Sequence, residues 1–427
     1  MATGPKQMAT RRSRPGRPIL VWALGLAAIA GVGAGVIAAT AAPTPPSVPA
    51  VATATPSPSA SSSGTETPSA TPTAASNPSP SATQSPLATA TPTATATPTP
   101  SPAVALVPAP MTGRMVTPDV AKRHPVAVMI DDHPAARPQS GFNDAAVVWQ
   151  APAEGGIPRY MMIFQDRVPP SVGPVRSARQ YYVAWASEWD AVYAHVGGSP
   201  QALQTLREKG RGQLVYNADE FRWGGIYFHR TRDRFAPHNV YTSGNELYRL
   251  SRRLGAKNTA MKPAWKFAPD KLLSLRPKGG SITTVYPWNT ITYRYDRMSN
   301  TYRRAVSTEK QQMDRGRKKQ VAPKNVIVMV MSFGPLNDGS KKHRLEAQFI
   351  GQGTAWIATN GKTIKGTWKK TSMTSPTRFY DKKGKQVILT VGQTFVQVMP
   401  RGSRITVKDG KVPPHVTVSY PRRDEWT

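Results

Sequence analysis

The chain has 427 residues, carries 56 lysines and arginines against 24 acidic residues for a formal net charge of +32, and contains no cysteine. The lack of cysteine excludes disulfide bonds, thiol catalysis and a lipid-modified cysteine anchor. The charge favours anionic partners such as wall polymers or phospholipid headgroups.

The N-terminal end has the pattern of a membrane anchor. Residues 1–18 hold five of the cations, and residues 19–42 form a run of 24 residues without a charge. A membrane-spanning helix needs about 20 apolar residues, whereas a cleaved signal has an apolar core of about 7–15. We therefore expect a cytoplasmic stub, a single span of the cell membrane and an extracytoplasmic remainder. The alternative is cleavage near Ala41, which would give a secreted protein.

A flexible linker follows the apolar run. Residues 43–110 hold 17 prolines among threonine, serine and alanine, and Glu66 is their one charged residue. Such a composition buries too little apolar surface to offset the entropy of the chain. We expect residues 43–118 to be a disordered linker, whose serines and threonines could carry O-glycans.

Residues 119–270 alternate between strand and helix patterns. Apolar runs of strand length lie at residues 126–131, 145–150, 160–164 and 191–196. Ser199 and Pro200 have the types preferred at the N-cap and first turn of a helix. A second helix is expected from Ser243 to the glycine at position 255. This part should have a mixed α/β structure.

Residues 271–427 have almost only strand patterns. Alternating runs at 290–295 and 301–306 precede an apolar run at 326–332, and Asn360-Gly361 predicts a hairpin turn. Further strands are expected at 386–389, 394–399 and 415–419. We predict an α+β fold in which the mixed α/β part packs against this mostly antiparallel β part.

Five polar segments adjoin the apolar strands of the first part. Their side chains should lie at strand ends, where sheets with α/β connections commonly form binding sites. The segments are residues 129–141, 150–159, 172–179, 195–201 and 236–241.

In this order the five segments resemble the YerB-like family, a bacterial envelope family of unknown function with lipoprotein and membrane-anchored members. Residues 360–368 and 392–394 are similar to its C-terminal part. The resemblance implies an α+β fold and an envelope location, but no activity. The family's lipid-bearing cysteine is missing, so the apolar segment should replace it. Asp132 stands where asparagine is common and Gln150 where glutamate is common, and we expect neither to be essential.

The candidate catalytic residues are Asp131 and Glu154, with His195 or His238 assisting, because glycan-cleaving enzymes use two carboxylates about 5–10 Å apart. The three histidines at 195, 229 and 238 could instead bind a metal with Asp131. No closely spaced histidine pair supports a metal site, and no cofactor is expected. Alternatively, neighbouring arginines hold both carboxylates in structural salt bridges.

The candidate ligand-binding residues suit an anionic group. Arginines form bidentate contacts with phosphate or carboxylate, and the glycines before Ser199 lead into a helix N-terminus that attracts anions. A plain capped glycine turn would have the same pattern. The candidates are Arg137, Arg159, Arg176, Arg179, Ser199 and Asn239.

Two functions are compatible with these patterns. The first is a noncatalytic, membrane-tethered domain that binds an anionic wall polymer or an envelope protein. The second is a wall-acting hydrolase or transferase that uses Asp131 and Glu154 as acid and base. Because no catalytic constellation appears at a diagnostic spacing, the sequence favours binding. An extracytoplasmic location argues against nucleic acid as the partner.

Overall fold

The computed structural model describes Met1, residues 105–307 and residues 309–414. The expected cytoplasmic stub, apolar span and most of the linker lie outside these residues, as does the strand expected at 415–419. Within the described residues, no helix has the length and apolar character needed to cross a membrane.

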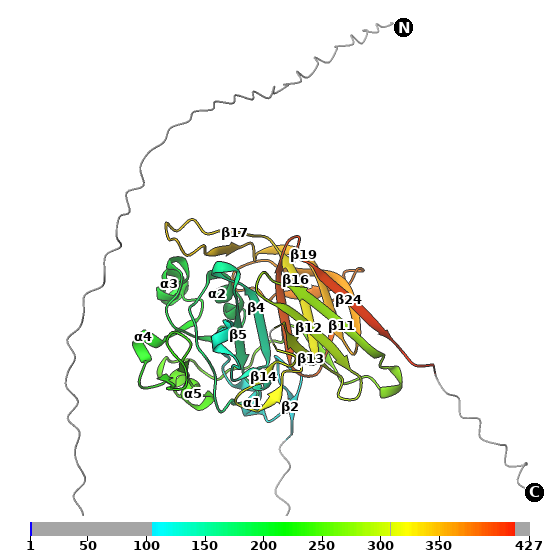
Figure 1. The fold of residues 1–427 in the computed structure, drawn as a ribbon, viewed down its shortest axis with the longest axis horizontal. Helices are drawn as coiled ribbons and strands as arrows, with labels where there is room; N and C mark the ends of the chain where they lie inside the picture. The colour runs from blue at the N-terminus through cyan, green and yellow to red at the C-terminus, as the bar shows by residue number, and fades with distance from the viewer. Residues whose placement is uncertain (2–104, 308, 415–427) are drawn as a thin grey trace, which may run out of the picture. The chain divides into compact units, whose positions relative to one another are not determined.

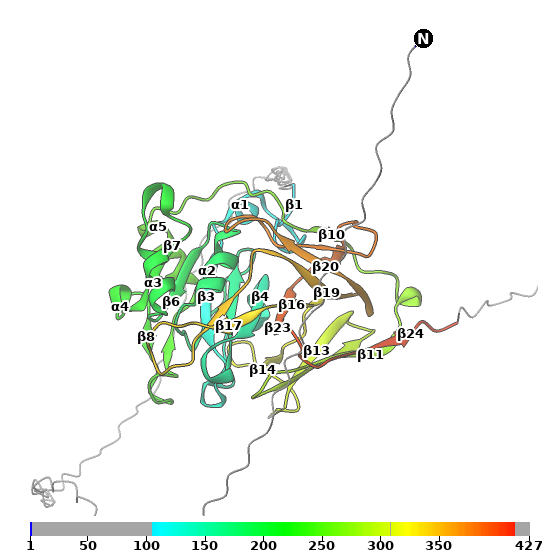
Figure 2. The same ribbon diagram turned by 90° about the horizontal axis from the view of Figure 1, so that it is seen from above.

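A ten-stranded mixed sheet crosses both halves of the chain (Figures 1 and 2). The halves meet where β23 and β4 pair in parallel, with Thr394 opposite Val147. Both expected parts therefore contribute to a single sheet. Its spatial order is β21 (Arg378–Tyr380), β20 (Lys362–Lys370), β19 (Gly351–Thr359), β16 (Asn325–Met331), β23 (Thr394–Pro400), β4 (Val147–Pro152), β5 (Pro158–Phe164), β3 (Val126–Asp131), β6 (Val192–His195) and β7 (Tyr216–Asp219).

A second, four-stranded antiparallel sheet packs on one face of the first. Its order is β13 (Thr301–Val306), β12 (Thr290–Asp296), β11 (Lys278–Val285) and β24 (Ile405–Lys411). Ile291 of this sheet belongs to the same buried cluster as Val148 and Val328 of the large sheet and Leu250 of α5 (Gly244–Arg253). The α+β class is therefore confirmed.

The opposite face of the large sheet is covered by α2 (Gln180–Ser187). Trp185 of this helix stacks on Trp149 of β4, with ring centroids 4.5 Å apart and an interplanar angle of 8°. The sequence patterns did not indicate α2. Seven of its eight residues are buried, so the helix lacks the polar face on which periodicity analysis depends.

Several local predictions are confirmed. Ser199 and Pro200 begin α3 (Pro200–Arg207), and the Ser243 hydroxyl accepts a hydrogen bond from the Glu246 N–H at the start of α5. Asn360 and Gly361 both have positive φ angles, 50° and 75°, as the predicted hairpin turn requires.

The folded part begins earlier than expected. β1 (Val107–Pro108) pairs with β2 (Met115–Val116), and Met111 between them is fully buried. The remaining elements are short: α1 (Pro118–Lys122), α4 (Glu220–Trp223), β8 (His229–Arg230), β9 (Val240–Tyr241), β10 (Lys266–Ala268), β14 (Met313–Asp314), β15 (Lys319–Gln320), β17 (Phe333–Pro335), β18 (Leu345–Ala347) and β22 (Ile388–Thr390).

Candidate functional site

Glu154 lies in the turn between β4 and β5 and is held by two arginines. Its Oε1 accepts a hydrogen bond from Arg159 Nη2 at 2.5 Å, and its Oε2 accepts from Nε of Arg179 at 2.9 Å and from Nη2 of the same side chain. Burial alone would raise the pKa of Glu154, but the two arginines outweigh it and hold the pKa at about 2. The carboxyl group is therefore ionised at neutral pH and has no proton to donate as a general acid.

Asp131, the last residue of β3, is held by a different set of partners. Its Oδ2 lies 2.7 Å from His238 Nδ1 and 3.0 Å from Arg176 Nε, and its Oδ1 accepts from the His133 N–H at 3.0 Å. The His133 and His238 rings stack with centroids 4.6 Å apart. Burial and the neighbouring His238 lower the pKa of His133, which favours a neutral imidazole in the stack.

Arg159 links the two carboxylate sites. It lies opposite Asp131 in the β3–β5 ladder. Its Nη1 donates at 2.9 Å to the carbonyl of Ser177, which lies between Arg176 and Arg179 in the sequence. Burial lowers the pKa of Arg159 to about 10, so the side chain is still protonated at neutral pH. The arginine cluster thus has three cations and two anions. It comprises Asp131, Glu154, Arg159, Arg176 and Arg179.

His195 and Ser199 make contacts of their own outside the arginine cluster. His195 is fully buried, with Nδ1 2.8 Å from the Gly197 carbonyl and Nε2 2.8 Å from Asn217 Oδ1. The Ser199 hydroxyl makes no capping hydrogen bond at the start of α3. A Cβ at position 198 would lie 3.2 Å from the Ala178 Cβ, so the glycine there permits close approach of two loops. This arrangement favours a structural role for the segment.

Asn239 and Arg137 also have protein partners. Asn239 Oδ1 accepts from Arg230 Nη1 at 3.0 Å, and Arg137 Nη2 lies 2.9 Å from Asp132 Oδ1. Within residues 105–307 and 309–414, no three histidine, aspartate or glutamate side chains are grouped as metal ligands would be. His229 is exposed on β8, and Asp131 contacts one histidine ring, that of His238.

The sequence analysis missed a buried polar network between the two sheets, centred on Arg304 of β13. This fully buried guanidinium donates from Nε to the Tyr293 hydroxyl at 2.9 Å, from Nη1 to the Tyr160 hydroxyl at 3.2 Å and from Nη2 to Gln150 Oε1 at 2.5 Å. Alternation along β13 was the available signal, because it places residue 304 on the same face as Tyr302 and Val306.

Gln150 connects this network to Asp132. Its Nε2 donates to Asp132 Oδ2 at 2.6 Å, while its Oε1 accepts from Arg304. Burial raises the pKa of Asp132, and the charges of Arg137 and Arg304 oppose that shift. Asp132 and Gln150, the two positions that depart from the family pattern, therefore contact each other. Through Arg304 their contacts help to hold the two sheets together.

The chain matches known proteins along most of its folded part. Residues 111–257 match the family described as protein of unknown function (DUF3048) N-terminal domain, and residues 282–396 match the DUF3048 C-terminal domain. A Bacillus subtilis (strain 168) protein named "Putative lipoprotein YerB" is 31% identical over 315 residues, which cover 71% of this chain and 89% of that protein. The crystal structure of YerB from Bacillus subtilis has a TM-score of 0.62 at 28% identity, covering 70% of this chain and 99% of the YerB chain.

Proposed function

The chain belongs to the DUF3048 family, which includes YerB, and we propose that it is a noncatalytic envelope domain that binds an anionic wall polymer. The relative's name marks it as a candidate lipoprotein, and lipoproteins are held at a membrane surface. This chain has no cysteine to carry a lipid, so the uncharged residues 19–42 would supply the anchor. The folded part would then work outside the cell membrane.

The observation that carries the proposal is that the carboxylates of the candidate site are paired with arginines inside the fold, whereas several exposed lysines have no acidic partner among the described residues. Glu154 holds two arginines, and the buried Asp132 has its own cation in Arg137. In contrast, Lys318 and Lys341 are exposed and form no ion pair with any residue that the structure describes. Unpaired surface cations attract polyanions, and salt weakens that attraction.

Binding is tested with the full-length protein and a purified phosphate-containing wall polymer. We expect binding at low salt that weakens at least tenfold between 50 and 500 mM NaCl, because exposed charges are screened. The variant Lys318→Glu/Lys341→Glu/Lys342→Glu should bind several-fold more weakly. Lys209→Glu/Lys257→Glu/Lys262→Glu, which reverses the same charge at other exposed positions, is the control. Salt-independent binding, or equal binding to a neutral glycan, would reject the proposal.

One contact favours the second candidate function, a wall-acting hydrolase or transferase. Asp131 holds Nδ1 of His238, which leaves Nε2 of that ring available as a base. The ionised Glu154 argues against the expected acid/base pair. Wild type, Glu154→Gln and His238→Gln should be incubated with wall fragments. If wild type releases products and His238→Gln does not, the enzymatic function replaces the binding one.

A further inference from the structure

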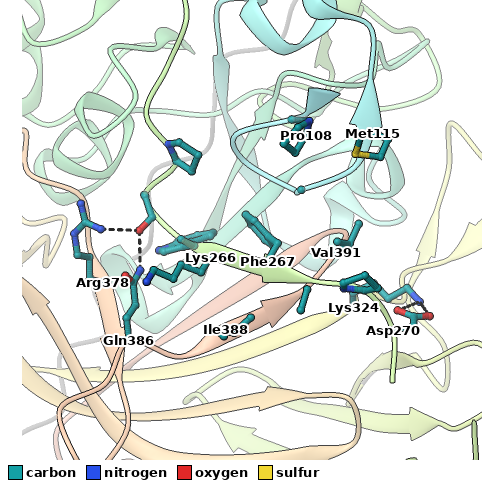
Figure 3. Close-up of a pocket in the computed structure, with 17 residues that line it drawn as sticks. Pro108, Met115, Lys266, Phe267, Asp270, Lys324, Arg378, Gln386, Ile388 and Val391 are labelled. Carbon is teal, nitrogen blue, oxygen red and sulfur yellow. Dashed lines mark hydrogen bonds and ion pairs between the residues drawn. The ribbon is translucent and has the colours of Figure 1, made fainter. Parts of the chain in front are cut away.

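A groove that shares no lining residue with the arginine cluster runs along β10 and β22, which pair in parallel (Figure 3). Its larger section has a volume of about 1090 Å³ and mostly apolar walls, which include Trp265, Phe267 and Val391. Its smaller section has a volume of about 390 Å³. The two sections adjoin each other, because both are lined by Ala268, Pro269, Gln386 and Ile388.

Most polar groups of the larger section have partners within the wall, and the exposed Lys266 is the exception among the described residues. Lys324 Nζ lies 2.7 and 3.0 Å from the two carboxylate oxygens of Asp270. Arg378 and Gln386 both donate to the Ala264 carbonyl, at 3.0 and 2.9 Å, as Figure 3 shows. This section therefore offers a ligand mainly apolar surface, and Met115 and Ile388 remain 59% and 46% exposed there.

The smaller section differs in its charge. It is lined by the exposed Lys271, Lys362 and Lys385, and none of the three forms an ion pair with another described residue. Lys362 Nζ donates to the Gly410 carbonyl at 2.9 Å. Asp381 is the one acid of this section, and its Oδ1 is occupied by the N–H groups of residues 383 and 385. One end of the groove is thus apolar and the other end is cationic.

We infer that this groove binds a single anionic phospholipid. One acyl chain lies against Trp265, Phe267 and Ile388, and the phosphate lies among the three lysines. The volume suits a small-molecule site, and the two ends match the two ends of the lipid. The linker is a poorer occupant, because its prolines fit the apolar section but its one charge, on Glu66, is far too little for the cationic section. This inference does not rest on polymer binding by Lys318, Lys341 and Lys342.

The test uses the full-length protein in detergent and a lysophosphatidylglycerol with a photoactivatable group in its acyl chain. After irradiation, mass spectrometry identifies the labelled peptides. We expect label on residues 263–269 and 386–391, and at least tenfold less label there with a monoacylglycerol of the same chain, which lacks the phosphate. Lys271→Gln/Lys362→Gln/Lys385→Gln should lower the labelling to a similar extent, because it removes the charges that hold the phosphate.

Two further variants make the result specific. Lys318→Gln/Lys341→Gln/Lys342→Gln removes the same charge elsewhere and should label like wild type. Ala268→Trp fills the junction of the two sections and should abolish groove labelling, with thermal unfolding used to check its fold. Label confined to residues 19–42, or equal groove labelling by the neutral lipid, would overturn the inference. So would cross-links between residues 43–104 and the groove that the lipid does not displace, since the linker would then be the occupant.

Discussion

Lys370 and Glu188 form an ion pair whose two side chains are fully buried, with Nζ 2.9 Å from Oε1. Glu188 follows α2 and Lys370 ends β20, so the pair joins residues 182 positions apart. The remaining polar atoms also have partners: Lys370 Nζ donates to the Ser375 carbonyl at 2.6 Å, and the Thr377 N–H donates to Glu188 Oε2 at 3.0 Å. Burial raises the pKa of Glu188 and lowers the pKa of Lys370.

Lys370→Met should lower the free energy of unfolding by about 3–5 kcal/mol, because it leaves the Glu188 carboxylate buried without its cation. Urea denaturation measures this value. Lys370→Met/Glu188→Gln should recover a large part of the loss, since no charge is then buried. If the double variant is no more stable than the single one, the uncompensated charge is not the cause.

Arg304→Lys should destabilise the protein by roughly 2–3 kcal/mol. Lysine keeps the charge but cannot reproduce the three directions in which the guanidinium reaches Tyr293, Tyr160 and Gln150. The neighbouring Arg303 is the matched control, because its side chain is 59% exposed and pairs with Asp296. Arg303→Lys should change stability by less than about 0.5 kcal/mol. Equal losses in the two variants would contradict a special role for the buried network.

Glu154→Gln should lower the free energy of unfolding at neutral pH and make that free energy less dependent on pH. The pKa of Glu154 falls from an ordinary 4.5 to about 2 on folding, so the ionised form stabilises the fold above pH 4.5. That contribution, at most about 3 kcal/mol, is lost as the pH falls from 4.5 towards 2. The difference between wild type and variant in the free energy of unfolding should therefore shrink between pH 7 and pH 3. Glu346→Gln, at an exposed position of β18, should show no such trend.

The predicted N-cap serines of α3 and α5 differ in whether the hydroxyl makes a capping hydrogen bond. Ser243→Ala removes the hydroxyl that accepts from the Glu246 N–H and should cost about 1 kcal/mol in the free energy of unfolding. Ser199→Ala removes a hydroxyl that makes no capping hydrogen bond and should cost less. Thermal denaturation of both variants checks the ranking. The reverse ranking would show that the cap of α5 contributes little.

Sequence patterns identified those parts of the fold that depend on near neighbours. The apolar run at 126–131 and the alternating run at 301–306 correspond to β3 and β13, and Asn360-Gly361 forms the turn between β19 and β20. α2 escaped prediction because it is buried on nearly all sides and has no polar stripe. The pairing of β23 with β4 also has no local signal, because it depends on residues in opposite halves of the chain.

The candidate site was predictable only where it depends on residues near the ends of neighbouring strands. Asp131, Glu154 and Arg159 lie near the ends of adjacent strands, so their proximity followed from the polar segments beside those strands. His195 was expected to join them, but its ring is held by Asn217 of β7 and a nearby carbonyl. Alternation along β13 indicates that Arg304 faces the interior, but its contact with Gln150, 154 positions away, has no local signal in the sequence.

The parallel β23–β4 junction also has a consequence for how the protein is made. Gln150 of β4 and its hydrogen-bond partner Gln397 of β23 are 247 positions apart. At a synthesis rate of about 5–20 residues per second, β23 is synthesised roughly 12–50 s after β4. During that interval an apolar strand has an unpaired edge, which invites association with other nascent chains. Export of the chain before it folds would separate such chains, and a chain that stops before Thr394 would keep the edge permanently open.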